Sequence, residues 1–289
     1  MLTAQITDIA NDLYTSYALQ KGFVVSPLLK FEMYDVEELN KRALSGKGTD
    51  LMKVSCSVLP KILDEYISLC VGGAFVKELS PKLVWGQKAS VKPLESCELL
   101  VPGVHTTAFL LTRIFFPEAK NFCVMPYHEI LELLSSGDER PALLIHSAED
   151  IEKKYCLREF ASLSSLWFAN TQAEFLPLGC LVAKKSLGRD VLKQLTSCLR
   201  DSIEYSKAHE EEVFDWILSC SPQLSRDALK NSVKAWVNKE TFNLSEKGEE
   251  SLKILMEKAS STFSYQNKPL VFKDKTYDVI YCNNWKICS

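Results

Sequence analysis

The sequence lacks long runs of one kind of residue, and these absences narrow the class of protein. No tract of five or more basic residues occurs, and 34 Lys and Arg residues are interspersed with 37 Asp and Glu residues, for a net charge of −3. A nucleic-acid partner is therefore not expected. No apolar run is long enough to predict a membrane-spanning helix. The first residues, MLTAQITDIANDLY, lack the basic head and apolar segment of a signal peptide. We expect a soluble protein of the cytoplasm.

Patterns that hold metals or disulfides are also missing. The ten cysteines include no C-x-x-C pair, and several of them lie in apolar segments. The four histidines show no spacing typical of a zinc site. We therefore predict reduced thiols in the core of a protein from a reducing compartment, and no metal site.

The composition and the hydrophobic pattern indicate a two-domain α/β protein. With 289 residues, 46% of them hydrophobic, the chain is long enough to bury a full core and to divide into two domains. Apolar runs of strand length alternate with segments of helical period. Because no Pro/Gly/Ser-rich linker occurs, ordered strands must join the domains. We predict a large lobe from residues 1–90 and 184–289, and a small inserted lobe from residues 91–183, connected by two strands.

Local signals predict where several elements begin and end. Asp35 is expected to cap a helix over DVEELNKRALSGKG, and Gly137 to close a helix over HEILELLSSG. The run TDLMKVS predicts a buried strand that ends at Ser55, and VLPKILDEYISL has helical spacing. Residues 188–259 are almost entirely helical in pattern, whereas the last 27 residues predict a hairpin or an edge addition.

Candidate site residues follow three predicted strands. They are Ser55 after DLMKV, Thr106 with Thr107 after ELLVPGVH, and His146 after ALLI. Ligands of open α/β sheets lie beyond the carboxyl ends of the strands, so a cleft between the lobes would bring these residues together. At the start of a helix, the two threonine hydroxyls and the N–H groups of Thr107 and Ala108 suit a carboxylate or phosphate. An ordinary threonine cap explains the same pattern.

Three further side chains each have a functional and a structural interpretation. His146 suits a general base because the unperturbed pKa of histidine is about 6.5, although, for a lone histidine, a core or strand-end residue bonded to a carbonyl is the better explanation. Ser55 has no evident activating base and no nucleophile-elbow pattern, which favours a hydrogen-bonding role. Cys56 is better explained as a buried thiol than as a nucleophile.

Taken in order along the chain, several segments resemble a single family. They are YDVEELNKRALSGKGTDLMKVS, LDEYISLCVGGA, VPGVHTTAFLLTRIFFPEA, LLIH, LPLGCLVAKKSLG and WVNKETFNLSEKG. This ordered set resembles the 1,4-dihydroxy-6-naphthoate synthases of the futalosine route to menaquinone, over nearly the whole chain up to about Ala259. The resemblance implies the bilobal fold of type II periplasmic-binding proteins, and catalysis in the cytoplasm without a metal or organic cofactor.

The resemblance also implies a reaction and the residues that serve it. Cyclic dehypoxanthinylfutalosine would bind in the cleft and be converted to 1,4-dihydroxy-6-naphthoate, with His146 as the catalytic base. The helix that starts at Thr106 would receive the substrate carboxylate. Matches to the family imply that Ser55, Thr107, Ala108, Asn11 and Asp12 bind the substrate, and the position of Thr106 at the helix start adds it to this set.

The chain departs from the family pattern at four places. Leu13 replaces a threonine, Ser57 a histidine and Ser147 a glutamate, and FVKELSP replaces a glycine-rich turn. Two alternatives therefore stay open: a cytoplasmic carboxylate-binding protein of the same fold without catalysis, and a chorismate dehydratase, which DVEELN and TTAFLLTR fit less well. In each case the expected partner is a small-molecule carboxylate, with no nucleic acid and no membrane, and the protein is expected to be a monomer or homodimer.

Overall fold

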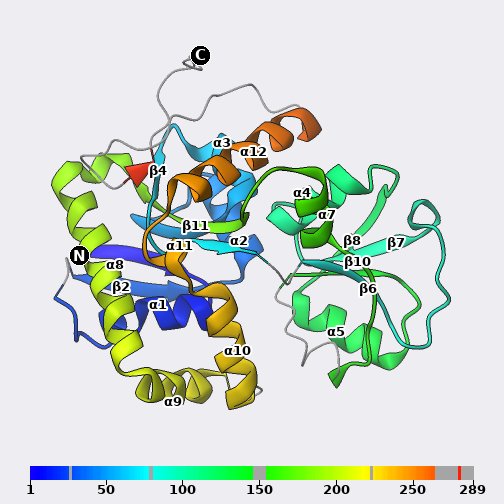
Figure 1. Cartoon of the computed structure of the whole chain (residues 1–289), viewed down its shortest axis with the longest axis horizontal. Helices are drawn as coiled ribbons and strands as arrows, with labels where there is room; N and C mark the ends of the chain where they lie inside the picture. The colour runs from blue at the N-terminus through cyan, green and yellow to red at the C-terminus, as the bar shows by residue number, and fades with distance from the viewer. Residues whose placement is uncertain (26–27, 78–80, 146–153, 222–223, 264–278, 281–289) are drawn as a thin grey trace.

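The chain forms two α/β lobes that lie side by side, each built around its own sheet (Figure 1). The computed structural model describes residues 1–25, 28–77, 81–145, 154–221, 224–263 and 279–280. His146 and Ser147 lie outside the described residues. The two lobes therefore provide the α/β architecture that the alternating pattern predicts.

The first lobe contains a mixed sheet with β3 near its centre. In the described part of the chain its order is β12-β4-β11-β3-β1-β2, and β5 also pairs with β11. β1 is parallel to β2 and β3, whereas β11 is antiparallel to β3, β4 and β5. The strands are β1 (Leu2–Ile6), β2 (Leu29–Met33), β3 (Leu51–Ser55), β4 (Tyr66–Leu69), β5 (Ala74–Val76), β11 (Leu176–Lys184) and β12 (Val279–Ile280).

Helices from both ends of the chain cover this sheet. α1 packs on α8, α9 and α10, and α12 contacts both β11 of the first lobe and α4 of the second. The helices of the first lobe are α1 (Ala10–Gln20), α2 (Val36–Leu44), α3 (Leu59–Ile62), α8 (Arg189–Ala208), α9 (Glu210–Cys220), α10 (Arg226–Trp236), α11 (Lys239–Phe242) and α12 (Glu246–Phe263), with short 3₁₀ turns η1 (Cys56–Val58) and η3 (Lys185–Leu187).

The second lobe has a smaller mixed sheet in the order β10-β6-β9-β7-β8. β7 is parallel to β8 and β9, and β6 is antiparallel to β9 and β10. Its elements are β6 (Lys82–Trp85), η2 (Leu94–Ser96), β7 (Glu98–Val101), α4 (Thr107–Phe115), β8 (Asn121–Val124), α5 (Tyr127–Ser136), β9 (Ala142–Leu144), β10 (Arg158–Ser162) and α7 (Leu163–Asn170).

The division of strands between the sheets differs from the predicted lobes of residues 1–90 with 184–289 and residues 91–183. β6 belongs to the second sheet because it pairs with β9 and β10. β11 belongs to the first sheet because it lies between β3 and β4. The chain thus passes between the lobes after β5 and again before β11. Both strands are apolar enough for either sheet, so their composition does not reveal where they pair.

Most local predictions agree with the observed elements. The Asp35 side chain caps α2 by accepting a hydrogen bond from the Glu37 N–H at 2.8 Å, and β3 ends at Ser55. The helical prediction over VLPKILDEYISL is only partly correct, since α3 stops at Ile62 and the buried strand β4 follows. A strand buried throughout is a continuous apolar run, and such a run is easily mistaken for a buried helix. Beyond the end of α12 at Phe263, the structure describes only β12, which pairs with β4.

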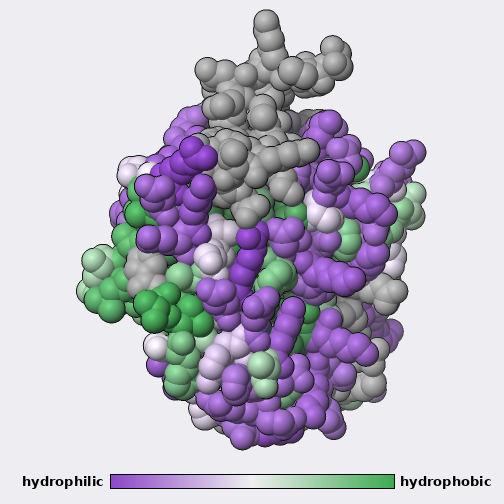
Figure 2. All heavy atoms as spheres, turned by 60° about the vertical axis from the view of Figure 1, so that its left-hand side comes forward, coloured by the Kyte–Doolittle hydropathy of each residue, from purple (hydrophilic) through white to green (hydrophobic). Residues whose placement is uncertain are grey.

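The apolar side chains are gathered inside the lobes. Every residue of β3 is buried, and Figure 2 shows a mostly hydrophilic face with hydrophobic side chains gathered at one side of it. The cysteines within the described residues are free thiols, and five of them are buried in the core, whereas Cys156 and Cys220 are exposed. Among the helices in that part of the chain, none combines the length and the apolar character needed to cross a membrane.

The left-handed backbone conformation of Gly137 at the end of α5 contributes to stability, and substitutions of this glycine measure how much. Gly137 has φ 100° and ψ 20°, and no heavy atom lies within 4 Å of the position where a Cβ would stand. Gly137→Ala therefore adds conformational strain without a clash, and we expect it to lower the free energy of unfolding by about 1–2 kcal/mol. Gly137→Asn should lower the free energy of unfolding by less than Gly137→Ala, because Asn adopts the left-handed conformation more readily than Ala. Denaturant unfolding measures both, and equal losses would contradict this explanation.

Candidate functional site

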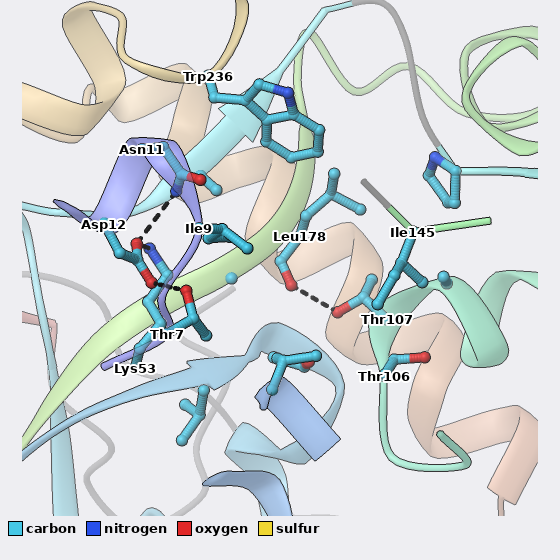
Figure 3. Close-up of a pocket in the computed structure, with 17 residues that line it drawn as sticks. Thr7, Ile9, Asn11, Asp12, Lys53, Thr106, Thr107, Ile145, Leu178 and Trp236 are labelled. Atoms are coloured by element: carbon cyan, nitrogen blue, oxygen red, sulfur yellow. Dashed lines mark hydrogen bonds and ion pairs between the residues drawn. The ribbon is translucent and has the colours of Figure 1, made fainter. Parts of the chain in front are cut away.

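A cavity lies between the two lobes. Its empty volume is about 530 Å³, counting the solvent at its mouth. Residues from the turn between β1 and α1, and from α1, β3 and β11, line it on one side, and the start of α4 lines it on the other (Figure 3). The lining residues are Thr7, Ile9, Asn11, Asp12, Val36, Lys53, Val54, Ser55, Ala74, Pro81, Thr106, Thr107, Ala108, Ile145, Leu178, Gly179 and Trp236.

The start of α4 presents unpaired backbone donors to this cavity. The Thr106 hydroxyl caps the helix by accepting from the Phe109 N–H at 3.1 Å, and it donates to the Gly103 carbonyl at 3.1 Å. Within the residues that the structure describes, the N–H groups of Thr107 and Ala108 have no hydrogen-bond acceptor. Such groups, together with the helix dipole, attract an anion.

The Thr107 hydroxyl joins the two lobes. It donates to the carbonyl of Leu178 in β11 at 2.8 Å and accepts from the Ser57 N–H at 3.2 Å (Figure 3). A hydroxyl has only one proton to donate, so the contact of Thr107 with an anion falls to its backbone N–H. Thr107 therefore lines the cavity, but its hydroxyl is engaged by the fold.

Ser55 is held at the end of β3 by a side chain that sequence reasoning missed. The Ser55 hydroxyl accepts from Asn40 Nδ2 and the Ser55 N–H donates to Asn40 Oδ1, both at 2.9 Å. Asn40 is fully buried in α2. In the described part of the chain no group accepts the Ser55 hydroxyl proton, which leaves it for a ligand.

A buried ion pair forms another part of the wall. The Asp12 carboxylate lies 2.7 Å from Lys53 Nζ, and the two side chains are 4% and 6% exposed. Lys53 also donates to the Gly72 carbonyl at 2.8 Å. Lys53 was missed from the sequence, although a lysine inside a buried apolar strand requires a buried acceptor and was a usable signal.

Glu37 fastens the loop before α4 to the first lobe. Its carboxylate accepts from the N–H groups of Val104 at 3.2 Å and His105 at 3.1 Å, and lies 2.7 Å from His105 Nδ1. The Glu37 side chain is only 6% exposed. Gly103 makes room for it, because a Cβ there would collide with the carboxylate. No sequence signal identified this contact.

Cys56 follows Ser55 but has no catalytic character. Burial, followed by a hydrogen bond with Cys180, raises the pKa of the Cys56 thiol. The thiolate needed for nucleophilic attack is therefore disfavoured, in agreement with its interpretation as a buried thiol.

The structure brings six of the seven predicted site residues to one cavity, and the seventh, His146, lies outside the described residues. The neighbour of His146 in the sequence, Ile145, lines the cavity. The six are Ser55, Thr106, Thr107, Ala108, Asn11 and Asp12. Among the described residues no cluster of three or more potential metal ligands occurs.

Glu37→Gln tests the fastening of the lobes. Gln keeps the size of the side chain but removes the charge and leaves one acceptor oxygen, so we expect the free energy of unfolding to fall by about 1–3 kcal/mol. Glu38→Gln is the matched control, since Glu38 forms only a partly exposed pair with Arg42 in the same helix and should change stability by less than about 0.5 kcal/mol. Equal losses in denaturant unfolding would contradict the role given to Glu37.

Comparisons with solved structures agree with this fold. A crystal structure of a protein from Archaeoglobus fulgidus matches with a TM-score of 0.84 at 25% identity, covering 90% of this chain and 97% of that one. The alkanesulfonate-binding protein SsuA from Xanthomonas axonopodis, bound to MOPS, matches with a TM-score of 0.67 at 9% identity, covering 92% and 94%. A Candida albicans protein described as having the generic periplasmic binding protein fold gives 0.62 at 13% identity, covering 92% and 97%. The predicted bilobal fold is confirmed.

Comparisons of sequence identify the family. Residues 3–261 match the family model described as menaquinone biosynthesis. A 1,4-dihydroxy-6-naphthoate synthase from Thermus thermophilus is 31% identical over 254 residues, covering 87% of this chain and 91% of the relative. One from Streptomyces coelicolor is 28% identical over 257 residues, covering 87% and 90%. The chain therefore belongs to the menaquinone biosynthesis family, with the 1,4-dihydroxy-6-naphthoate synthases, and is an enzyme of that pathway.

Proposed function

We propose that this protein is a carbon–carbon lyase that converts cyclic dehypoxanthinylfutalosine to 1,4-dihydroxy-6-naphthoate without a metal or organic cofactor. It acts in the cytoplasm as a monomer or homodimer on this small-molecule carboxylate, with no nucleic-acid or membrane partner. One observation carries the proposal: the N-terminus of α4 opens into the cavity between the lobes with the N–H groups of Thr107 and Ala108 unpaired in the described chain.

The substrate carboxylate binds at this helix end. The adjacent N–H groups of Thr107 and Ala108 can both donate to one carboxylate. The positive end of the dipole of α4, a helix of nine residues, also attracts the negative charge. Apolar side chains make up most of the cavity wall, which strengthens these hydrogen bonds relative to bulk solvent. Binding at this point fixes one end of the substrate.

Apolar side chains then hold the ring system of the substrate. Ile9, Val36, Ile145 and Leu178 line the cavity beyond the helix end, and the Trp236 side chain enters it from the end of α10 (Figure 3). These walls fit an aromatic body that carries one carboxylate.

His146 acts as the general base in this proposal. It removes a proton activated by a neighbouring carbonyl, the sugar-derived ring fragments, and formation of the aromatic naphthoate supplies much of the driving force. The cavity orients the substrate for this step and keeps water away from the reacting atoms.

The direct test is turnover. The purified protein is incubated with cyclic dehypoxanthinylfutalosine and followed for the naphthoate chromophore, with the Thermus thermophilus relative as control. His146→Asn should lower the rate by about 10²–10⁴-fold while substrate still raises the melting temperature of the variant. A wild-type protein that is stabilised by the substrate but does not turn it over would replace the lyase with a binding protein of the same fold.

The role of α4 has a separate test. We expect 1,4-dihydroxy-6-naphthoate to bind more tightly than its methyl ester by about tenfold or more, because the ester cannot form charge-assisted hydrogen bonds. The amide signals of Thr107 and Ala108 should shift on binding of the acid in ¹⁵N-resolved NMR spectra. Equal affinities for the acid and the ester would contradict binding of the carboxylate at the start of α4.

A further inference from the structure

The Asp12 carboxylate organises the polar groups at the side of the cavity away from α4. It accepts hydrogen bonds from Asn11 Nδ2 at 3.0 Å and from Thr7 Oγ1 at 2.6 Å, besides its ion pair with Lys53. Thr7, Asn11 and Asp12 are all at least nine-tenths buried, and all three line the cavity. The cavity wall therefore contains a hydrogen-bonded group held by one carboxylate.

The carboxylate determines which atoms of its neighbours stay free. Because an ionised carboxylate can only accept hydrogen bonds, the Asn11 amide must turn its NH₂ group toward Asp12. Its Oδ1 is then directed away from Asp12, as Figure 3 shows. Likewise, Thr7 gives its single hydroxyl proton to Asp12 and keeps its lone pairs. We call Asn11 Oδ1 and Thr7 Oγ1 the acceptor end of the cavity.

Lys53 holds the Asp12 carboxylate in place without occupying the acceptor end. Two of the three ammonium protons of Lys53 are directed at Asp12 and at the Gly72 carbonyl. The Lys53 stem also packs closely against β11, since a Cβ at Gly179 would stand 3.3 Å from Lys53 Cε. The ammonium group is thus held behind Asp12, and the ion pair fixes the position of the carboxylate.

The acceptor end lies across the cavity from the N-terminus of α4. Figure 3 shows Asn11, Asp12 and Thr7 on one side and Thr107 on the other, with Ile9 and Leu178 between them. One side presents backbone N–H donors, which suit a carboxylate, and the other presents neutral acceptors, which suit hydroxyl donors. An apolar part of the cavity wall thus separates an end that donates hydrogen bonds from an end that accepts them.

We propose that Asn11 Oδ1 and Thr7 Oγ1, oriented by Asp12, bind hydroxyl groups at the end of the ligand opposite its carboxylate and so select hydroxylated aromatic carboxylates. This inference rests on the proposed function, because it assumes that the carboxylate binds at α4. It adds Thr7 as a specificity-determining residue and Lys53 as a positioning residue that acts through Asp12.

The test compares two ligands that differ only in their hydroxyl groups. 1,4-Dihydroxy-6-naphthoate and 2-naphthoate share the ring system and the carboxylate, and isothermal titration calorimetry under anaerobic conditions gives the affinity of each. For the wild-type protein we expect the dihydroxy ligand to bind about three- to tenfold more tightly per hydroxyl group engaged, the range expected of a neutral hydrogen bond.

Variants of the acceptor end should remove this preference selectively. Asn11→Leu and Thr7→Val keep the size of the side chains, and each should reduce the preference by about three- to tenfold while the affinity for 2-naphthoate stays within twofold. Thr7→Ser restores the hydroxyl and the preference. Thr15→Val is the matched control, because the Thr15 hydroxyl bonds the Asp12 backbone carbonyl and Thr15 does not line the cavity.

The positioning role of Lys53 has its own readout. Lys53→Met keeps most of the length of the side chain and removes the ammonium group that pairs with Asp12, so the carboxylate is no longer held in place to orient Asn11 and Thr7. The preference for the dihydroxy ligand should therefore fall by about three- to tenfold in Lys53→Met, while the affinity for 2-naphthoate stays within twofold. An unchanged preference in Lys53→Met would remove Lys53 from the proposal.

The outcomes separate this inference from the proposed function. If neither naphthoate binds, the proposed function fails. If both ligands bind but the wild type does not prefer the hydroxylated one, or if Asn11→Leu and Thr7→Val weaken both ligands equally, the acceptor end fails and the carboxylate site at α4 stands. Circular dichroism and melting curves show that each variant compared is folded.

Discussion

The geometry of the cavity depends on one carboxylate that crosses from one lobe to the other. Glu37 stands in the first turn of α2, where the helix dipole favours a negative charge, and it binds two backbone N–H groups and the imidazole of the loop before α4. That loop leads directly into the helix whose free N–H groups face the cavity. The position of donors on the second lobe is thereby set by an acceptor on the first.

The other polar groups of the cavity follow the same principle. The Thr107 hydroxyl is bonded to β11 and η1, the Ser55 hydroxyl is held by Asn40, and the Asn11 amide is oriented by Asp12. Each group is fixed by a partner in the protein before a ligand arrives. Little reorganisation is then needed on binding, which is the condition under which hydrogen bonds in a closed site contribute most to orientation and rate.

Sequence reasoning predicted the parts of the molecule that depend on neighbours along the chain. The Asp35 cap, the left-handed Gly137 and the end of β3 at Ser55 each follow from a few adjacent residues. Four of the six described site residues lie next to predicted strand ends or helix starts for the same reason, whereas Asn11 and Asp12 were implied only by the family resemblance. The family resemblance, which uses the order of many short segments, supplied the bilobal fold.

The contacts that sequence reasoning missed join residues far apart in the chain. Glu37 and His105 are 68 residues apart, and Asn40 reaches Ser55 across a turn and a strand. A charged residue in a predicted buried strand was a signal for Lys53, but nothing in the sequence identified Asp12 as its partner. The predicted lobe boundaries differ from the observed ones for the same reason. The sheet to which β6 or β11 belongs is decided by strand pairing and not by composition.

The two passages between the lobes have a consequence for the order of folding during synthesis. The strands of the second sheet come from one continuous stretch, from Lys82 to Ser162, whereas β3 and β4 of the first sheet are joined through β11, which follows that stretch. On the ribosome, the second lobe can complete its sheet while the first still lacks a central strand. The N-terminal residues that line the cavity, Thr7 to Asp12 among them, must therefore wait for more than a hundred and sixty residues to be added before their own sheet can close.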